Sequence, residues 1–360
     1  MTRRREPPRP PLTGRALAAV VFAGACLGPA TGHPEGGRPR PGRPPAPPPA
    51  AWVGLVGEYG TGAAPLIVRE SDGRLEAVLG DSPPLILTPA RGDAFRLAAR
   101  RGGPPETLVF TRDAAGRATA VAREGASLPR RAWGVDGAGT FRVAPSRPVA
   151  DLLREARAAP PPREPGPFRP VDLVEVTALE PAIRLDVRYA TADNFLATPV
   201  YPEARAFLQR PAAEALARAH RRLAPFGHSL LVHDAYRPWS VTRVFWDATP
   251  PDKREFVADP ADGSRHNRGC AVDLTLYRLD DGEVVEMPGV YDEMSERSYP
   301  DFPGGTSEQR WRRELLRWAM EAEGFRVFAS EWWHFDHRDW RRYPIVNLPF
   351  DRVSGDRGAR

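Results

Sequence analysis

The stretch "SEWWHFDH", residues 330–337, places a glutamate and a histidine three positions apart with two tryptophans between them. Two interpretations are open: a buried aromatic strand that carries two polar residues, or half of a metal site. Side chains alternate between the two faces of a regular strand, so Glu331 and His334 would point to opposite sides. A shared site therefore requires a turn or a β-bulge, and we predict one at Trp332 and Trp333.

A second stretch, "SRHNRGCAVDLTL" at residues 264–276, offers the remaining ligands. Its last six residues alternate as a strand, which puts Asp273 on the face opposite to Val272 and Leu274. His266 precedes Asp273 by seven residues across Gly269, which can turn the chain so that the two side chains converge. A catalytic zinc site uses three protein ligands, and His334 is the natural third. Each histidine alone is by default a core residue, whereas the combination favours a metal site.

Two further residues would complete a hydrolytic site around such a metal. Zinc lowers the pKa of bound water to about 7, and Glu331 could take up the proton as a general base; its alternative role is a surface salt bridge, which the two tryptophans disfavour. In "HDAYRPWSV", residues 233–241, Arg237 follows an apolar strand and could stabilise an oxyanion. We interpret His233 and Asp234 in the same stretch as structural residues.

The composition argues against nucleic acid as a partner. The 360 residues include 51 Lys and Arg against 46 Asp and Glu, for a net charge of +5, and almost all of the basic residues are arginines spread along the chain. A nucleic-acid interface would need them clustered on one face. We therefore predict that the chain does not bind nucleic acid.

The amino-terminal residues have the pattern of an export signal. Basic residues are followed by an apolar run over residues 16–27, which is shorter than the ~20 residues that a membrane-spanning helix needs. We predict a signal peptide or lipoprotein signal over residues 1–30, with Cys26 as a possible lipid attachment site, and a periplasmic, cell-envelope-associated or lipoprotein location. After cleavage only Cys270 certainly remains, so no disulfide within the mature chain is expected.

The rest of the chain divides by composition. We predict a Pro-rich tether over 31–50, an all-β module (a meander or small barrel) over 51–145, a Pro-rich linker over 146–170 and an α+β domain over 171–352. The all-β module shows short apolar or alternating runs separated by turn signals, and it resembles the small β domain appended to some penicillin-binding-protein-like serine hydrolases, with "VGEYG" and "TLVFTRDAAGRATAV" as the matching runs. In the α+β domain, "AIRLDVRYA", "HSLLVHDAY" and "FRVFASEWWHFD" suggest strands. Residues 211–223 suggest a helix, and residues 306–324 a second one with a capping box.

The motifs of the α+β domain resemble a known family. "SRHNRGCAVD" has the form Ser-x-His-x-x-Gly-x-Ala-x-Asp, and with "EWWH" and "DAYRP" it looks like the D-alanyl-D-alanine dipeptidases, zinc peptidases related to the D,D-carboxypeptidases and to the hedgehog amino-terminal domain. "LDVRYATADNFLATPVY", "YDEMSERS" and "RYPIVNLPF" extend the resemblance over about residues 171–350.

The resemblance implies a role for each residue at the site. It implies one Zn²⁺ per domain bound by His266, Asp273 and His334, with Glu331 as general base and acid and Arg237 stabilising the transition state. The pocket-lining residues that it implies are Asp292, which would hold the substrate ammonium, with Ser264 and Tyr189. Each of these last three could also be structural: Asp292 as a loop cap, Ser264 as a turn residue and Tyr189 as a core residue.

The implied function is hydrolysis of the D-Ala-D-Ala dipeptide to two D-alanines in cell-wall peptide turnover or recycling. Two alternatives stay open: a D,D- or L,D-carboxypeptidase that acts on longer peptidoglycan stem peptides, and a catalytically inactive zinc-containing module that binds the wall. The implied partner is a small dipeptide. The ligand of the β module and the oligomeric state do not follow from the sequence.

Overall fold

The computed structural model describes residues 38–62, 64–98, 106–131 and 140–353. The predicted signal segment, Cys26 and the first part of the tether lie outside these residues. Among the helices of the described ranges, none has both the length and the apolar character that crossing a membrane requires.

The first module is a meander of eight strands. Its strands are β1 (Gly57–Tyr59), β2 (Leu66–Ser71), β3 (Arg74–Leu79), β4 (Leu85–Pro89), β5 (Ala94–Leu97), β6 (Glu106–Arg112), β7 (Ala118–Arg123) and β8 (Ala126–Pro129), preceded by α1 (Ala50–Val53). Each strand pairs antiparallel with the next, and an antiparallel bridge between Tyr59 and Arg130 joins the two ends, so the sheet is a nearly closed barrel. Alternate side chains such as Leu66 and Val68 point into its apolar core. The predicted all-β module is therefore confirmed.

The second module is built on a five-stranded mixed sheet. Its order is β10 (Arg184–Leu185), β12 (His228–Asp234), β13 (Ala271–Arg278), β15 (Glu331–His337) and β14 (Phe325–Phe328), with only β10 and β12 parallel. A separate two-stranded sheet pairs β9 (Leu173–Glu175) with β11 (Phe207–Gln209). The central strands β12 and β13 are buried along almost their whole length, as their apolar composition predicts.

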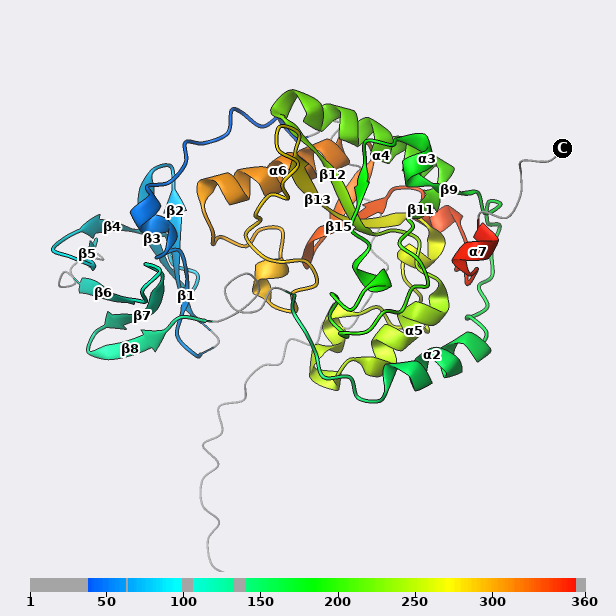
Figure 1. Ribbon diagram of the computed structural model, residues 1–360, viewed down its shortest axis with the longest axis horizontal. Coiled ribbons are helices and arrows are strands. Elements are labelled where there is room, and N and C mark those ends of the chain that lie inside the picture. Colours follow the sequence, from blue (N-terminus) through cyan, green and yellow to red (C-terminus); the bar gives the residue numbers. More distant parts are fainter. Residues whose placement is uncertain (1–37, 63, 99–105, 132–139, 354–360) are drawn as a thin grey trace, which may run out of the picture. The chain divides into compact units, whose positions relative to one another are not determined.

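Helices complete the second module. They are α2 (Val149–Ala158), α3 (Val176–Leu179), α4 (Arg210–Leu223), α5 (Trp239–Ala248), α6 (Ser307–Glu321) and α7 (Phe350–Val353), with short 3₁₀ turns η2 to η7 between them. The helices α4 and α6 contact each other and the sheet, and α2 packs on α5 (Figure 1). Thr306 and Gln309 form the predicted capping box of α6, and Gly324 follows its end at a φ of +88°. The mixture of helices and sheet agrees with the predicted α+β class.

Three local features differ from the sequence interpretation. "AIRLDVRYA" forms only the two-residue β10, and its last part is the 3₁₀ turn η2 (Arg188–Ala190), which contains Tyr189. "FRVFASEWWHFD" is a hairpin of β14 and β15, because the chain reverses at Ala329 and Ser330. The predicted linker over 146–170 contains α2, whose Leu152 is buried in the core of the second module.

Candidate active site

The hairpin at the edge of the sheet brings Glu331 and His334 together. Val327 pairs with Phe335, but the next residue of β14, Phe328, pairs with Glu331, so residues 332–334 form an irregular segment of β15. The Glu331 carboxylate lies 3.6 Å from Nδ1 of His334 as a result. The predicted bulge at Trp332 and Trp333 is therefore confirmed, and both tryptophans are buried beside it.

A tight turn directs His266 toward Asp273. The 3₁₀ turn η5 (His266–Arg268) ends at Gly269, which has a φ of +64°, and β13 starts two residues later. A Cβ atom on Gly269 would lie 2.4 Å from Cδ2 of Leu173 and 3.3 Å from the backbone nitrogen of Gln209. Glycine is thus required both for its backbone conformation and for the close approach of β11. The turn places Nε2 of His266 3.3 Å from Oδ1 of Asp273.

His266, Asp273 and His334 form a buried group that could hold a metal ion. Nδ1 of His334 lies 3.0 Å from Oδ1 of Asp273 and 3.0 Å from Nε2 of His266. Two atoms bound to one tetrahedral zinc at about 2.0–2.1 Å lie about 3.3 Å apart, so these spacings fit such an ion. Two imidazole nitrogens and one carboxylate oxygen are also a donor set that zinc accepts.

Three protein contacts aim these donor atoms at one point. Nδ1 of His266 lies 2.6 Å from the carbonyl oxygen of Ala235, which leaves Nε2 for a metal. Nε2 of His334 lies 2.9 Å from Oδ1 of Asp336, which leaves Nδ1. The hydroxyl of Tyr291 donates to Oδ2 of Asp273 over 3.2 Å. Such outer contacts fix the tautomer and orientation of metal-binding side chains.

The side chains of this group shift one another's pKa values. Burial opposes ionisation of Asp273, but His266 and His334 hold its pKa well below its usual range. Burial favours a neutral His334, but Asp336 and Asp273 together raise its pKa to about 10. A metal that binds through Nδ1 of His334 would therefore compete with a proton at this ring.

Glu331 has the environment of a proton acceptor. Burial raises its pKa to about 7, and the nearby His334 opposes that shift only in part. A carboxylate with a pKa near neutrality can both accept and return a proton at physiological pH.

Arg237 enters the same cavity from the end of β12. Its Nε donates to Oδ2 of Asp234 over 2.9 Å, and one terminal nitrogen lies 3.8 Å from Asp273. The guanidinium also lies over the ring of Phe245, with its central carbon 4.7 Å from the ring centroid. Asp234, interpreted as structural, is buried and positions Arg237, while its Oδ1 accepts a hydrogen bond from Tyr201 over 2.7 Å.

The predicted substrate residues lie in the same cavity. The Tyr189 hydroxyl donates to Asp292, with 2.9 Å to Oδ2. Burial and the negative charge of Asp273 raise the pKa of Asp292 well above its usual range, and a cationic group beside it would lower this pKa and favour the ionised form. Ser264 accepts from the backbone of His266 through Oγ over 3.2 Å and so also holds the η5 turn.

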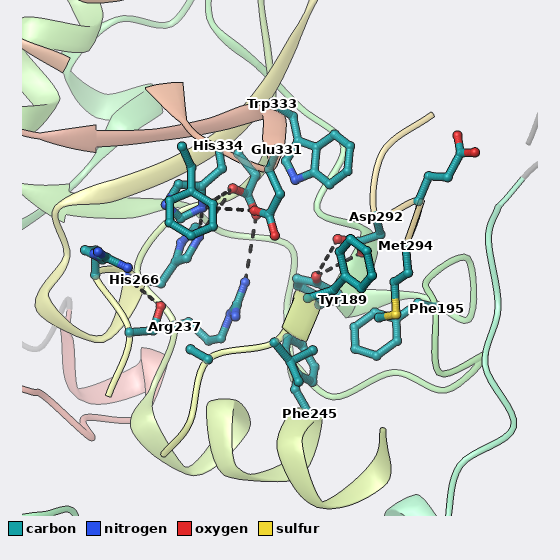
Figure 2. A pocket seen from close by; sticks show the side chains of 18 of the residues that line it. Tyr189, Phe195, Arg237, Phe245, His266, Asp292, Met294, Glu331, Trp333 and His334 are labelled. Carbon is teal, nitrogen blue, oxygen red and sulfur yellow. Dashed lines mark hydrogen bonds and ion pairs between the residues drawn. The ribbon is translucent and has the colours of Figure 1, made fainter. Parts of the chain in front are cut away.

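One cavity of about 130 Å³ unites all of the predicted site residues (Figure 2). It is lined by His266, Asp273, His334, Glu331, Arg237, Asp292, Ser264 and Tyr189, among others. Its volume is well below the roughly 300–1,000 Å³ of a typical ligand pocket, so it suits a small substrate.

The sequence interpretation missed three polar residues that support the site. Asp336 and Tyr291 contact the metal-binding candidates directly. Asn267 fixes the η5 turn, because its side chain accepts from the backbone of Ser264 over 2.7 Å and donates to the carbonyl of Arg237 over 2.9 Å. Asp336 stands two residues after His334 in a strand, so alternation alone could have placed it on the side of that histidine.

Comparison with known proteins identifies relatives of the second module. A family model described as D-ala-D-ala dipeptidase, of the M15 peptidases, matches residues 169–351. D-alanyl-D-alanine dipeptidase of Escherichia coli is 35% identical over 175 residues, which cover 49% of this chain and 89% of that protein. The Enterococcus faecium protein of the same name is 38% identical over 47% of this chain and 91% of its own length, and the Streptomyces coelicolor protein is 36% identical over 46% and 90%.

The family model does not extend over residues 1–168. Among solved structures, a crystal structure of SurE with D-Leu is 25% identical with a TM-score of 0.21, covering 24% of this chain and 21% of that one. That likeness is too small to bear on the fold.

Proposed function

The chain belongs to the D-Ala-D-Ala dipeptidase family of metallopeptidases, and on this basis we propose that it hydrolyses D-alanyl-D-alanine to two D-alanines with one zinc ion. The observation that carries the proposal is the convergence of His266, Asp273 and His334 on one point, with Glu331 3.6 Å from His334 in the same cavity.

The metal would be held by Nε2 of His266, Nδ1 of His334 and a carboxylate oxygen of Asp273. When bound, zinc in such a site acts as a Lewis acid and makes water nucleophilic near neutral pH. Glu331 takes the proton of the attacking water and delivers it to the leaving amine. In the metal-free protein burial raises its pKa to about 7, which favours proton uptake.

Arg237 would stabilise the negative charge that develops on the carbonyl oxygen. It is held in place by Asp234, so little reorganisation is needed when that charge appears. Asp292 would bind the substrate ammonium, and Tyr189 orients its carboxyl group through the hydroxyl. Ser264 and Tyr189 line the same cavity of about 130 Å³, whose small volume would limit the size of the substrate.

We further propose that the protein is exported and acts on wall-derived dipeptide, with possible membrane attachment through a lipidated Cys26. The leader pattern of residues 1–30 supports this location. We also propose that the second module is structurally related to the hedgehog amino-terminal domain. We propose in addition that the chain does not bind nucleic acid.

The test is release of D-alanine from free and N-acetylated D-Ala-D-Ala, each with and without a chelator. We expect rapid release from the free dipeptide, almost none from the N-acetylated form, and loss of release on chelation. Efficient cleavage of the N-acetylated dipeptide or of a pentapeptide stem would instead identify a carboxypeptidase. A zinc-loaded protein that releases no D-alanine would indicate a wall-binding module.

A further inference from the structure

The active-site cavity contains a cation that the mechanism above does not use. Among the described residues that line it, the arginines are Arg237 and Arg265. Arg237 pairs with the carboxylate of Asp234 through Nε and a terminal nitrogen, at 2.9 and 2.8 Å. Arg265 lies between Ser264 and His266 in the chain and so enters the cavity beside a predicted metal ligand.

The guanidinium of Arg265 is fixed in position by its neighbours, but its hydrogen-bond donors are not all paired within the described part of the protein. It lies between two aromatic rings, with its central carbon 5.4 Å from the centroid of Phe328 and 5.1 Å from that of Trp340. Its Nε is buried and has no hydrogen-bond partner among the described residues, and the nearest carboxylate oxygen, on Asp336, is 3.5 Å away. The side chain lines the cavity and keeps 37% of its surface exposed, so the guanidinium can reach a ligand through donors other than the buried Nε.

The charged side chains that line the cavity differ between its two ends. Figure 2 shows Asp292 and Tyr189 on one side of Glu331 and His266 on the other. Arg265 belongs to the His266 side, because it adjoins His266 in the η5 turn and its Nε faces Asp336, the partner of His334. The cavity therefore has a carboxylate at one end, a cation at the other, and the candidate metal site between them.

A free dipeptide matches this order of charges. It carries an ammonium at one end and a carboxylate at the other, with the scissile carbonyl in the middle. An arginine fork donates two parallel hydrogen bonds to a carboxylate, a stronger arrangement than a single neutral hydrogen bond.

We propose that Arg265 binds the carboxyl-terminal carboxylate of the substrate and so makes the enzyme specific for peptides that end at the residue to be released. This inference rests on the proposed function and deepens it. The substrate class is then a short zwitterionic peptide, and a peptide whose carboxyl terminus is amidated or extended is rejected at this end of the cavity.

The experiment compares D-Ala-D-Ala with D-Ala-D-Ala amide in the zinc-loaded full chain and in its Arg265→Gln and Arg265→Lys variants. Removal of one charge-assisted contact typically weakens binding by about 10- to 100-fold. We expect Arg265→Gln to lower kcat/KM for the acid by about that factor, mainly through KM, and to change kcat/KM for the amide by less than about threefold. Arg265→Lys keeps the positive charge but cannot donate two parallel hydrogen bonds. Its kcat/KM for the acid should therefore lie between the values of the unmodified protein and of Arg265→Gln.

Two controls separate carboxylate binding from a structural role. Arg341 also lies over Trp340, with its central carbon 4.2 Å from the ring centroid, but it is exposed and absent from the cavity wall, so Arg341→Gln should leave both substrates unaffected. Zinc content should equal that of the unmodified protein in every variant.

The outcomes are distinct. An equal loss for acid and amide, with or without loss of zinc, would show that Arg265 acts only by supporting Asp336 and His334, and would overturn the inference while the proposed function stands. An unchanged acid rate would overturn it as well. An unmodified, zinc-loaded protein that cleaves neither substrate would overturn the proposed function and the inference with it.

Discussion

Glu331 carries the clearest prediction for a single residue. Its carboxylate lies within reach of the candidate metal site, yet it makes none of the three contacts that define the ligand group. We expect Glu331→Gln to lower kcat for D-Ala-D-Ala by about 100- to 10,000-fold, because a general base is lost, and to leave zinc content unchanged. D-alanine release and metal analysis on the same sample would check both statements. The exposed Glu283→Gln serves as control, and loss of zinc from Glu331→Gln would reassign this residue as a ligand.

Asp336 is a positioning residue whose effect should appear in metal affinity. Its contact with Nε2 of His334, at 2.9 Å, leaves Nδ1 of that ring directed toward Asp273. An amide at this position could present either its oxygen or its NH₂ group and would fix the ring less firmly. We expect Asp336→Asn to weaken zinc binding by about 10- to 100-fold, measured by competition with a chromophoric chelator. Asp339→Asn, three residues further on, should bind zinc as the unmodified protein does; equal affinities for both variants would refute the assignment.

At the scale of elements, the η5 turn is where the site depends most on a single backbone position. Both Gly269 and Gly227 have positive φ, at +64° and +73°, but a Cβ would meet close neighbours only at Gly269. We expect Gly269→Ala to reduce the free energy of unfolding by about 1–3 kcal/mol, more than Gly227→Ala, because a steric conflict with β9 and β11 adds to the backbone strain. Urea unfolding of the two variants would measure the difference. Equal losses would mean that Leu173 moves aside freely.

Short-range sequence pattern predicts several of the helices, strands and bulges. The alternation of β13, the capping box of α6 and the bulge in β15 all depend on residues within a few positions of one another, and the sequence predicted each of them. The hairpin between β14 and β15, the short β10 and the packing of α2 depend on partners far away in the chain. The support that Asp234 gives to Arg237 was missed for a similar reason: a buried carboxylate near a strand end acquires a role only when the chain that follows turns back toward it.

At the scale of the molecule, the described residues form two apolar cores, and a polar contact joins the two modules that contain them. Glu70 of β2 is buried, and its carboxylate accepts from the backbone nitrogen of Ser307 over 2.7 Å at the first residue of α6. A carboxylate is favourable at a helix amino terminus. Arg310 adds a hydrogen bond to the carbonyl of Glu70 over 2.8 Å. The family model covers residues 169–351 and does not include the β module, so this contact joins the matched region to a segment outside it.

A second buried carboxylate, Glu58 of β1, should make the stability of the protein depend on pH. Burial raises its pKa from 4.5 to about 7, while Arg297 and Arg131 oppose the shift in part. The folded protein therefore keeps this proton to a higher pH than the unfolded chain does, and the associated stability is lost as pH rises from about 4.5 through about 7.

Glu58→Gln removes this ionisation and should stabilise the protein relative to the unmodified chain above pH 7. We expect a gain of about 1–3 kcal/mol at pH 8.5 and little difference at pH 5, from urea unfolding at the two values. Glu124→Gln, an exposed position of the same module, should show no such dependence. A constant difference between pH 5 and 8.5 would contradict the assignment.

The contacts that aim the three candidate ligands have a consequence for the order of folding and metal uptake. Ala235, Asp336 and Tyr291 each hold one ligand through the protein alone, and the strand pairing of Asp273 with His334 belongs to the central sheet. Small zinc modules, by contrast, fold only when the ion binds. A chelated sample of this protein should therefore keep its circular dichroism spectrum, and activity should return on addition of zinc without a refolding phase.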